Sequence, residues 1–196
     1  MNSPNPKIYL VRHGQTQWNK EGRFQGRLNS PLTQKGKLQA QKNGEKLKKY
    51  IDKDIKVYAS PLGRAKETAF IICDELNIDR DKIIFDNRII EFDYGVFEGR
   101  ERDEVKETKE FKDREANKWY YQIENGESYE IVQKRVKEFL EEIKEIDKVL
   151  IIAHEMVNRT LRGIYCNYTK EDTLKLKQPN DVILLLDEGK EEILFK

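Results

Sequence analysis

The chain has few residues of the kinds that mark disulfide-bonded, metal-binding or membrane proteins. Its 196 residues include only two cysteines and two histidines. Two cysteines in a chain of this length do not suggest a disulfide framework, so Cys73 and Cys166 are expected to be small packing residues in helical segments. The longest apolar runs are about five residues, far short of the roughly 20 that a membrane-spanning helix needs. We therefore expect no membrane span.

The chain also lacks an excess of charge of either sign. Lys plus Arg is 37 and Asp plus Glu is 36, which gives a formal net charge of +1. Without a global positive field, nucleic acid is not an expected partner. No Walker A motif, dinucleotide fingerprint or paired C-x-x-C is present, and no cofactor is expected. Residues 1–7 contain no hydrophobic signal core, so a cytoplasmic location is expected by default.

The composition indicates a folded and strongly solvated protein. Hydrophobic residues make up 37% of the chain and charged residues another 37%. The apolar residues fall in periodic blocks, whereas in a disordered chain they would be scattered. The length suits one domain, 1–196, and no repeat or linker argues for two. The oligomeric state stays open, because no coiled-coil heptad or other assembly signature appears.

Strand-like and helix-like segments alternate along the chain. Apolar blocks predict strands at 8–11, 55–59, 149–153 and 182–186. Apolar stripes predict helices within 40–51, 65–76 and 129–143. The unbroken 149–153 run is typical of a parallel strand buried on both faces, whereas 182–187 and 193–195 predict an antiparallel hairpin at the edge. The predicted fold class is therefore α/β, a three-layer sandwich with a mostly parallel, mixed central sheet flanked by helices.

Residues 100–126 depart from this alternation. They are rich in Lys and Glu and then carry Trp119, Tyr120 and Tyr121. We predict a helical excursion that covers the site, with the charge run on a solvated helix face. The aromatic side chains are either pocket walls or packing residues. Ser128 is predicted to be the N-cap of the helix that follows.

Both histidines stand directly after an apolar run that predicts a buried strand. His13 follows Ile8-Tyr9-Leu10-Val11-Arg12, and His154 follows Val149-Leu150-Ile151-Ile152-Ala153. In an open α/β sheet, residues at the carboxyl ends of strands line the crevice where ligands bind. Each histidine alone could be an ordinary core or loop residue. The neighbouring Arg12 and Gly14 favour a shared active site.

Four sequence blocks in order resemble one known family. The segment VRHGQTQWN at 11–19, with RFQG at 23–26 and SPLTQKG at 30–36, resembles the opening signature of the histidine phosphatase superfamily, also called the phosphoglycerate mutase-like family. The segment SPLGRAKETA at 60–69 is similar to its second arginine block. EFDYGVFEG at 91–99 is similar to its acidic block, and Ala153-His154 to its second histidine. The resemblance implies a phosphoglycerate mutase-like fold.

Phosphoryl-transfer chemistry explains why these residue types occur together. His13 is the predicted nucleophile, because a neutral imidazole can attack phosphorus and hold the phosphoryl group covalently. Arg12 and Arg64 are predicted to clamp the phosphoryl oxygens. Asn19 would add a neutral donor, and His154, if protonated, a charged donor at the transition state. These residues form the predicted phosphate site, with structural ion pairing as the alternative role of Arg64.

The resemblance places proton donation to the leaving alkoxide on Glu91. Shielding from water would raise the pKa of this carboxyl, although nearby arginines oppose that shift. The same arginines should lower the pKa of His13, so we expect the two histidines to have opposite protonation states. Gln25 and Gly26 match positions that contact substrate in the family, with a tight turn as the alternative role of Gly26.

The residue after the second histidine departs from the family pattern. Relatives commonly have glycine there, whereas this chain has Glu155. A carboxylate beside an anion pocket could weaken phosphate binding or narrow the range of substrates. The sequence HEMVN at 154–158 is one residue short of the zinc-protease pattern, and the asparagine at its end is a poor zinc ligand. No metal site is expected.

The favoured function is a cytoplasmic hydrolase. It would be a phosphatase that hydrolyses small phosphorylated metabolites through a phosphohistidine, without a metal. The first alternative is a cofactor-dependent phosphoglycerate mutase. Mutases of the family carry a basic residue where this chain has Phe92, and further arginines in a longer insert. The second alternative is a noncatalytic phospholigand-binding regulator, which only Glu155 motivates.

Overall fold

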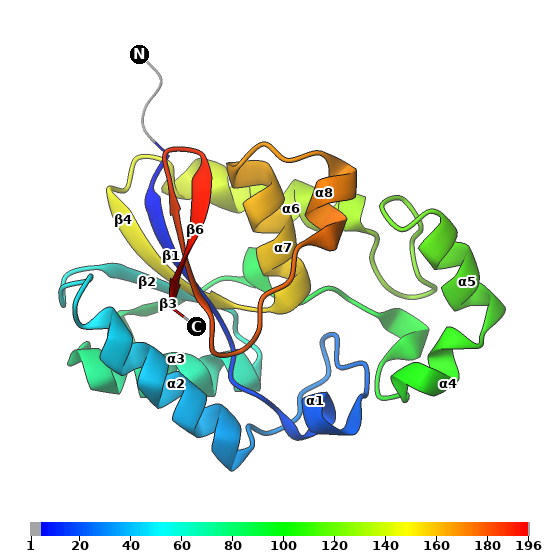
Figure 1. The fold of residues 1–196 in the computed structure, drawn as a ribbon, viewed down its shortest axis with the longest axis horizontal. Coiled ribbons are helices and arrows are strands. Elements are labelled where there is room, and N and C mark those ends of the chain that lie inside the picture. Colours follow the sequence, from blue (N-terminus) through cyan, green and yellow to red (C-terminus); the bar gives the residue numbers. More distant parts are fainter. Residues whose placement is uncertain (1–4, 196) are drawn as a thin grey trace.

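A six-stranded mixed sheet forms the centre of the protein, as the computed structural model of residues 5–195 shows (Figure 1). Its strand order is β3-β2-β4-β1-β5-β6. The strands are β1 Lys7–Arg12, β2 Lys56–Ala59, β3 Ile83–Phe85, β4 Lys148–Ala153, β5 Ile183–Asp187 and β6 Lys190–Phe195. Strands β1 to β4 pair in parallel, whereas β5 and β6 are antiparallel. The predicted mostly parallel, mixed sheet is confirmed.

The ends of the chain are not described by the structure. Residues 1–4 and residue 196 lie outside the described part. The ends of the predicted domain and most of the N-terminal segment 1–7 therefore fall outside it as well.

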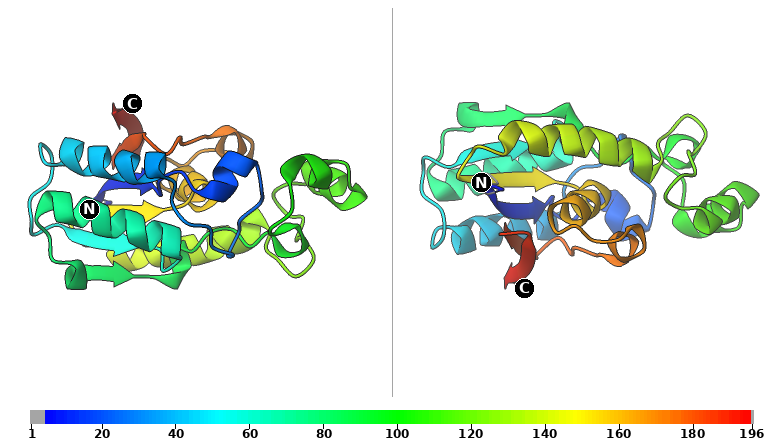
Figure 2. Two further views of the ribbon diagram at one scale, coloured as in Figure 1. Left: turned by 90° about the horizontal axis from the view of Figure 1, so that it is seen from below. Right: turned by 90° about the horizontal axis from the view of Figure 1, so that it is seen from above.

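Helices flank the sheet on both faces (Figure 2). They are α1 Gln17–Glu21, α2 Gln34–Leu47, α3 Gly63–Leu76, α4 Arg102–Lys106, α5 Lys109–Ala116, α6 Tyr129–Ile143, α7 Glu155–Tyr165 and α8 Lys170–Lys175. Single 3-10 turns are η1 Arg80–Lys82, η2 Asn87–Ile89 and η3 Gly95–Phe97. The helices predicted within 40–51, 65–76 and 129–143 correspond to α2, α3 and α6. β3 was not predicted, because a three-residue strand leaves almost no periodic signal. The helical segment expected at Cys166 is the end of α7.

The alternation of side chains along β1 builds a separate core on each face of the sheet. Ile8 and Leu10 pack in the cluster that contains residues of α6 and α7. Tyr9 and Val11 point the other way and pack in the cluster that contains residues of α2 and α3. Because successive side chains of a strand point to opposite faces, a central strand in this arrangement must be apolar at every position.

The excursion at 100–126 carries α4 and α5 and lies beyond the carboxyl ends of β1 and β4 (Figure 2). Its charge run is largely solvated, as the exposed ion pair between Lys109 and Asp113 illustrates. Trp119 is buried and stacks on Tyr129, with 5.7 Å between ring centroids. Tyr120 is half exposed. Packing is therefore the role of Trp119.

Smaller predictions about the helices also hold. Ser128 is the N-cap of α6, because its side chain accepts a hydrogen bond from the Ile131 amide. Cys73 is buried in α3, Cys166 is partly buried at the end of α7, and both are free thiols. No helix in the described part of the chain combines the length and apolarity that crossing a bilayer requires.

Candidate active site

The register of two neighbouring strands brings the histidines together. Arg12 at the end of β1 pairs with Ala153 at the end of β4, and the His13 amide continues the ladder by donating to the Ala153 carbonyl over 3.0 Å. The next residue on each strand is a histidine. The ring centroids of His13 and His154 are 5.1 Å apart, and both side chains are buried.

The His13 ring is held in one tautomer. Its Nδ1 lies 2.7 Å from the Gly14 carbonyl oxygen, which can only accept a hydrogen bond. Nδ1 therefore carries the proton, and Nε2 keeps its lone pair. Burial, followed by the charges of Arg64 and Arg12, lowers the pKa of His13 well below 6.5. His13 is thus a neutral imidazole with a free nucleophilic nitrogen, as its predicted role requires.

Arg64 stands in the first turn of α3, at the carboxyl end of β2. Its Nη1 donates to the Leu28 carbonyl over 2.7 Å, and its Nη2 donates to the Gly26 carbonyl over 2.6 Å. Nε is buried and has no hydrogen-bond partner among the described residues. Burial lowers the pKa of Arg64 to about 10. Nη1 and Nη2 are therefore anchored, and the Nε–H remains available to bind an anion.

Arg12 follows the same pattern. Its Nη1 contacts both the Gln178 carbonyl and Oε2 of Glu155 at 2.9 Å, whereas its buried Nε has no partner within residues 5–195. The Glu155 carboxylate also lies 3.6 Å from Arg159 on the next turn of α7. Glu155 thus anchors one corner of Arg12 and leaves Nε unoccupied.

His154 is the N-cap residue of α7 and is fully buried. Its Nε2 lies 2.7 Å from Ser60 Oγ, and its Nδ1 has no partner in the described chain. Burial lowers the pKa of His154 well below 6.5, and the charge of Arg64 adds to that shift. The expectation of opposite protonation states is therefore wrong for this structure. Desolvation and the arginines act on both rings and keep both neutral.

Glu91 lies between η2 and η3 and is only 7% exposed. One carboxylate oxygen accepts a hydrogen bond from the Phe92 amide over 2.8 Å. Burial raises the pKa of Glu91 against the opposing effects of that hydrogen bond and of Arg64 and Arg12. The carboxyl group therefore keeps its proton to a higher pH than an exposed glutamate, which suits a general acid.

The remaining predicted residues lie in the segment between β1 and α2, which includes α1. Asn19 uses its side-chain oxygen in the capping box of α1, where it accepts from the Thr16 amide. Its NH₂ group can still donate to a ligand. Gln25 is buried and accepts from the Thr16 hydroxyl over 3.0 Å. Both contacts are structural, so substrate contact by Asn19 and Gln25 stays a prediction.

Gly26 adopts a φ of +52°, in the left-handed region. A Cβ here would overlap the Glu98 carboxylate, which accepts hydrogen bonds from the amides of Arg27, Leu28 and Tyr94. This geometry agrees with the tight-turn role of Gly26. Because its carbonyl anchors Arg64, the turn also positions the predicted phosphate clamp.

Comparison with known proteins decides the family. A model of the histidine phosphatase superfamily (branch 1) matches residues 8–195. The chain belongs to this superfamily. It is 34% identical over 166 residues to phosphoserine phosphatase 1 of Hydrogenobacter thermophilus. This match covers 82% of this chain and 74% of that protein.

This histidine phosphatase is also similar to a probable mutase and to a solved structure. It is 43% identical over 120 residues to the probable phosphoglycerate mutase GpmB of Salmonella paratyphi C, which covers 61% of this chain. The match spans only half of GpmB. The structure of Bacillus stearothermophilus YhfR superposes with a TM-score of 0.81 at 29% identity, over 96% of this chain and 95% of YhfR.

Several contacts of this histidine phosphatase site were not predicted. Thr68 accepts from the Gly14 amide, the Asn180 side chain donates to the His13 carbonyl, and the Gln178 carbonyl accepts from Arg12. Gln178 and Asn180 lie in the α8–β5 loop, where no local pattern signals them. Ser60 could have been found, because it directly follows β2 just as His13 follows β1.

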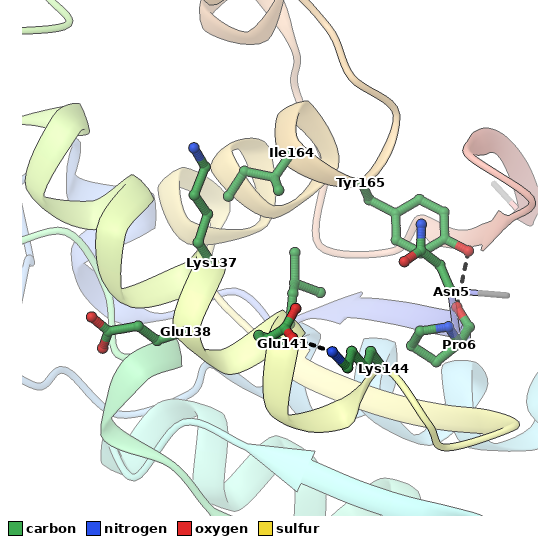
Figure 3. Close-up of a pocket in the computed structure, with 9 residues that line it drawn as sticks. Asn5, Pro6, Lys137, Glu138, Glu141, Lys144, Ile164 and Tyr165 are labelled. Atoms are coloured by element: carbon green, nitrogen blue, oxygen red, sulfur yellow. Dashed lines mark hydrogen bonds and ion pairs between the residues drawn. The ribbon is translucent and has the colours of Figure 1, made fainter. Parts of the chain in front are cut away.

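A separate cavity of about 590 Å³ lies away from this chemistry (Figure 3). Its lining residues are Asn5, Pro6, Lys137, Glu138, Leu140, Glu141, Lys144, Ile164 and Tyr165. Asn5 and Pro6 precede β1, so the cavity lies at the amino ends of the strands, at the opposite edge of the sheet from the histidines. Among the described residues, neither histidine nor any arginine lines it.

Proposed function

We propose that this histidine phosphatase hydrolyses small phosphomonoesters through a phosphohistidine on His13. One observation supports this most directly. Arg12 Nε, Arg64 Nε and His154 Nδ1 are all buried, and none has a partner in residues 5–195. Buried polar groups are almost always hydrogen-bonded, so three such nitrogens around one nucleophile favour an anionic ligand with several acceptor oxygens.

In the first step, His13 Nε2 attacks phosphorus. An N–P bond forms as the P–O bond to the leaving group breaks, and Glu91 gives its proton to the departing alkoxide. Nε of each arginine compensates charge on the phosphoryl oxygens. The Gly14 carbonyl keeps Nδ1 of His13 protonated throughout. An alcohol leaves, and the enzyme holds a phosphohistidine.

In the second step, water attacks the phosphohistidine. An O–P bond forms, the N–P bond breaks, and the Glu91 carboxylate takes a proton from the attacking water. Inorganic phosphate leaves and His13 returns to its neutral form. Each residue is restored, so the cycle needs neither a metal nor a cofactor.

Phosphatase action is favoured over mutase action by the residue after Glu91. Phe92 is fully buried and packs on Tyr94 and Tyr129, with ring centroids 4.9 and 5.3 Å away. This position therefore offers no positive charge to a second phosphate. The similarity to GpmB keeps mutase action as the second candidate, to be tested directly.

We propose that the excursion at 100–126 covers the site and selects the leaving group. Its position beyond the carboxyl ends of β1 and β4 supports this role. A cytoplasmic location remains part of the proposal, as expected from the sequence. Neither nucleic acid nor a membrane is proposed as a partner.

The test is turnover of p-nitrophenyl phosphate by the pure protein in EDTA, repeated with His13→Ala. We expect metal-independent phosphate release that falls at least about 10³-fold in the variant. Trapping with a ³²P-labelled ester should label the wild type, and the label should be stable in base and labile in acid. Turnover that survives His13→Ala would refute the nucleophile, and a complete lack of turnover would favour the noncatalytic regulator.

A separate assay tests mutase action. The protein is incubated with phosphoglycerate primed by its bisphosphate, and isomerisation is compared with phosphate release. We expect release to dominate. Isomerisation that outpaces release would replace the phosphatase proposal with the mutase.

A further inference from the structure

Ser60 occupies the same place on β2 that the histidines occupy on their strands. β2 and β4 pair in parallel with Ala59 opposite Ile152, and the Ser60 amide donates to the Ile152 carbonyl over 3.0 Å. The residue after β2 therefore faces the residue after β4. Ser60 Oγ lies 2.7 Å from Nε2 of His154, and both residues have no exposed surface.

The other contact of Ser60 indicates the direction of this hydrogen bond. The Leu62 amide lies 3.4 Å from Ser60 Oγ, and an amide N–H can only donate to it. The hydroxyl proton must then point at an acceptor. Among the contacts of Ser60 Oγ within residues 5–195, His154 Nε2 is the one atom that can accept. Ser60 therefore donates to Nε2, and the proton of the neutral ring lies on Nδ1.

The Nδ1 atom of His154 is the nitrogen that has no partner in the described residues. In the opposite tautomer it would present a lone pair to the phosphoryl oxygens and repel them. A protonated ring would avoid that repulsion. Burial and the charge of Arg64, however, hold the pKa of His154 well below 6.5.

We propose that Ser60 is a positioning residue that fixes His154 as the neutral Nδ1–H tautomer, so that the ring donates to a phosphoryl oxygen without carrying charge. The inference rests on the proposed function. It gives the pocket three N–H donors with two positive charges, those of Arg12 and Arg64. Two charges match a phosphate ester dianion, so binding does not require an additional proton on a buried ring.

The first test is spectroscopic and uses the fact that the chain has two histidines. In ¹⁵N-labelled protein near neutral pH, with and without orthovanadate, Nδ1 of His154 should give the signal of a protonated ring nitrogen and Nε2 that of an unprotonated one. Ser60→Ala should shift His154 toward the Nε2–H tautomer. An Nε2–H tautomer or a cationic His154 in the wild type would overturn the proposal.

The second test is a double-mutant cycle on turnover. Ser60→Ala should lower kcat about tenfold or more, because one donor to a developing oxyanion is lost. His154→Ala also lowers kcat, because it removes the ring and with it any tautomer that Ser60 could select. Adding Ser60→Ala to His154→Ala should therefore lower kcat by less than about twofold more. An equal loss in both backgrounds would show that Ser60 acts only through packing.

Ser30→Ala is the matched control. Ser30 is buried and its hydroxyl accepts a backbone N–H, from Trp18, but no described contact joins it to His154. It should leave the His154 signals unchanged. A His154 shift as large as that of Ser60→Ala would count against the proposal. Lack of turnover in the wild type would refute the proposed function, whereas the tautomer of the unliganded protein tests Ser60 independently.

Discussion

Nη1 of Arg12 lies 2.9 Å from Oε2 of Glu155, in an ion pair that is mostly shielded from solvent. The carboxylate stands in the first turn of α7, where the helix dipole favours a negative charge. It contacts Nη1 of Arg12, which also donates to the Gln178 carbonyl, and Nε of Arg12 has no partner in the described part of the chain. The glutamate that departs from the family pattern therefore orients an arginine of the predicted phosphate clamp, and its charge would oppose a second anion nearby.

Glu155→Gln should strengthen the binding of phosphate. An amide oxygen can still accept from Arg12, but the negative charge is gone. We expect the inhibition constants of inorganic phosphate and orthovanadate to fall by up to about tenfold, equivalent to about 1.4 kcal/mol. Glu171→Gln, on the exposed face of α8, is the control and should change neither constant. Weaker inhibition in Glu155→Gln would show that the carboxylate itself is required for binding.

Glu91→Gln should show its effect only when the leaving group needs a proton. For an alkyl phosphate, kcat should fall by about 10² to 10⁴, the usual contribution of general acid catalysis. For p-nitrophenyl phosphate, whose phenolate leaves without protonation, the first step should be much less affected. Burst kinetics separate that step from hydrolysis of the phosphohistidine. An equal loss of the first-step rate for both esters would contradict the acid role.

Gly26→Ala and Gly22→Ala form a matched pair. Both glycines have a positive φ, +52° and +74°, so each alanine should cost about 1 kcal/mol of unfolding free energy. Only at position 26 does the added Cβ overlap the Glu98 carboxylate, because no atom of residues 5–195 lies within 4 Å of a Cβ at position 22. Gly26→Ala should also lose kcat/KM, since its carbonyl anchors Arg64. Equal kcat/KM in the two variants would contradict this link.

The two buried histidines should make stability fall on acidification. Their folded-state pKa values lie below 6.5, so the unfolded chain binds protons first. Above about pH 6.5 the histidines should therefore not change the free energy of unfolding. As the pH drops from there toward the folded pKa values, the free energy of unfolding should fall by up to about 1.4 kcal/mol per pH unit for each ring.

Urea denaturation between about pH 7.5 and about pH 5.5 measures this slope. His13→Gln and His154→Gln should each flatten it. The raised pKa of Glu91 acts in the opposite direction, because it adds stability at low pH that is lost as the pH rises from 4.5 toward the folded value. Repeating the series in Glu91→Gln removes that contribution. A slope unchanged by either histidine substitution would exclude the linkage.

The parts of the fold that were predicted correctly are those that produce a local pattern of apolar residues in the sequence. The apolar runs before His13 and His154, and the stripes of α2, α3 and α6, reflect periodic burial within a few turns or residues. β3 is too short for such a pattern. The family blocks indicated the site residues by resemblance, but not their hydrogen bonds. Contacts between distant segments bury His154 and so lower its pKa. They also decide that Glu155 pairs with Nη1 of Arg12.

The sequence by itself determined the α/β class, the family and the placement of each histidine at the end of a strand, because these depend on local patterns and short motifs. The tertiary structure alone decided that β1 and β4 are neighbours whose last residues pair in register, which brings the two imidazoles within 5.1 Å. It also decided that Ser60 meets His154. The protonation of the two imidazoles and the direction of their hydrogen bonds follow from burial and from partners far away in the chain. No local sequence pattern encodes these.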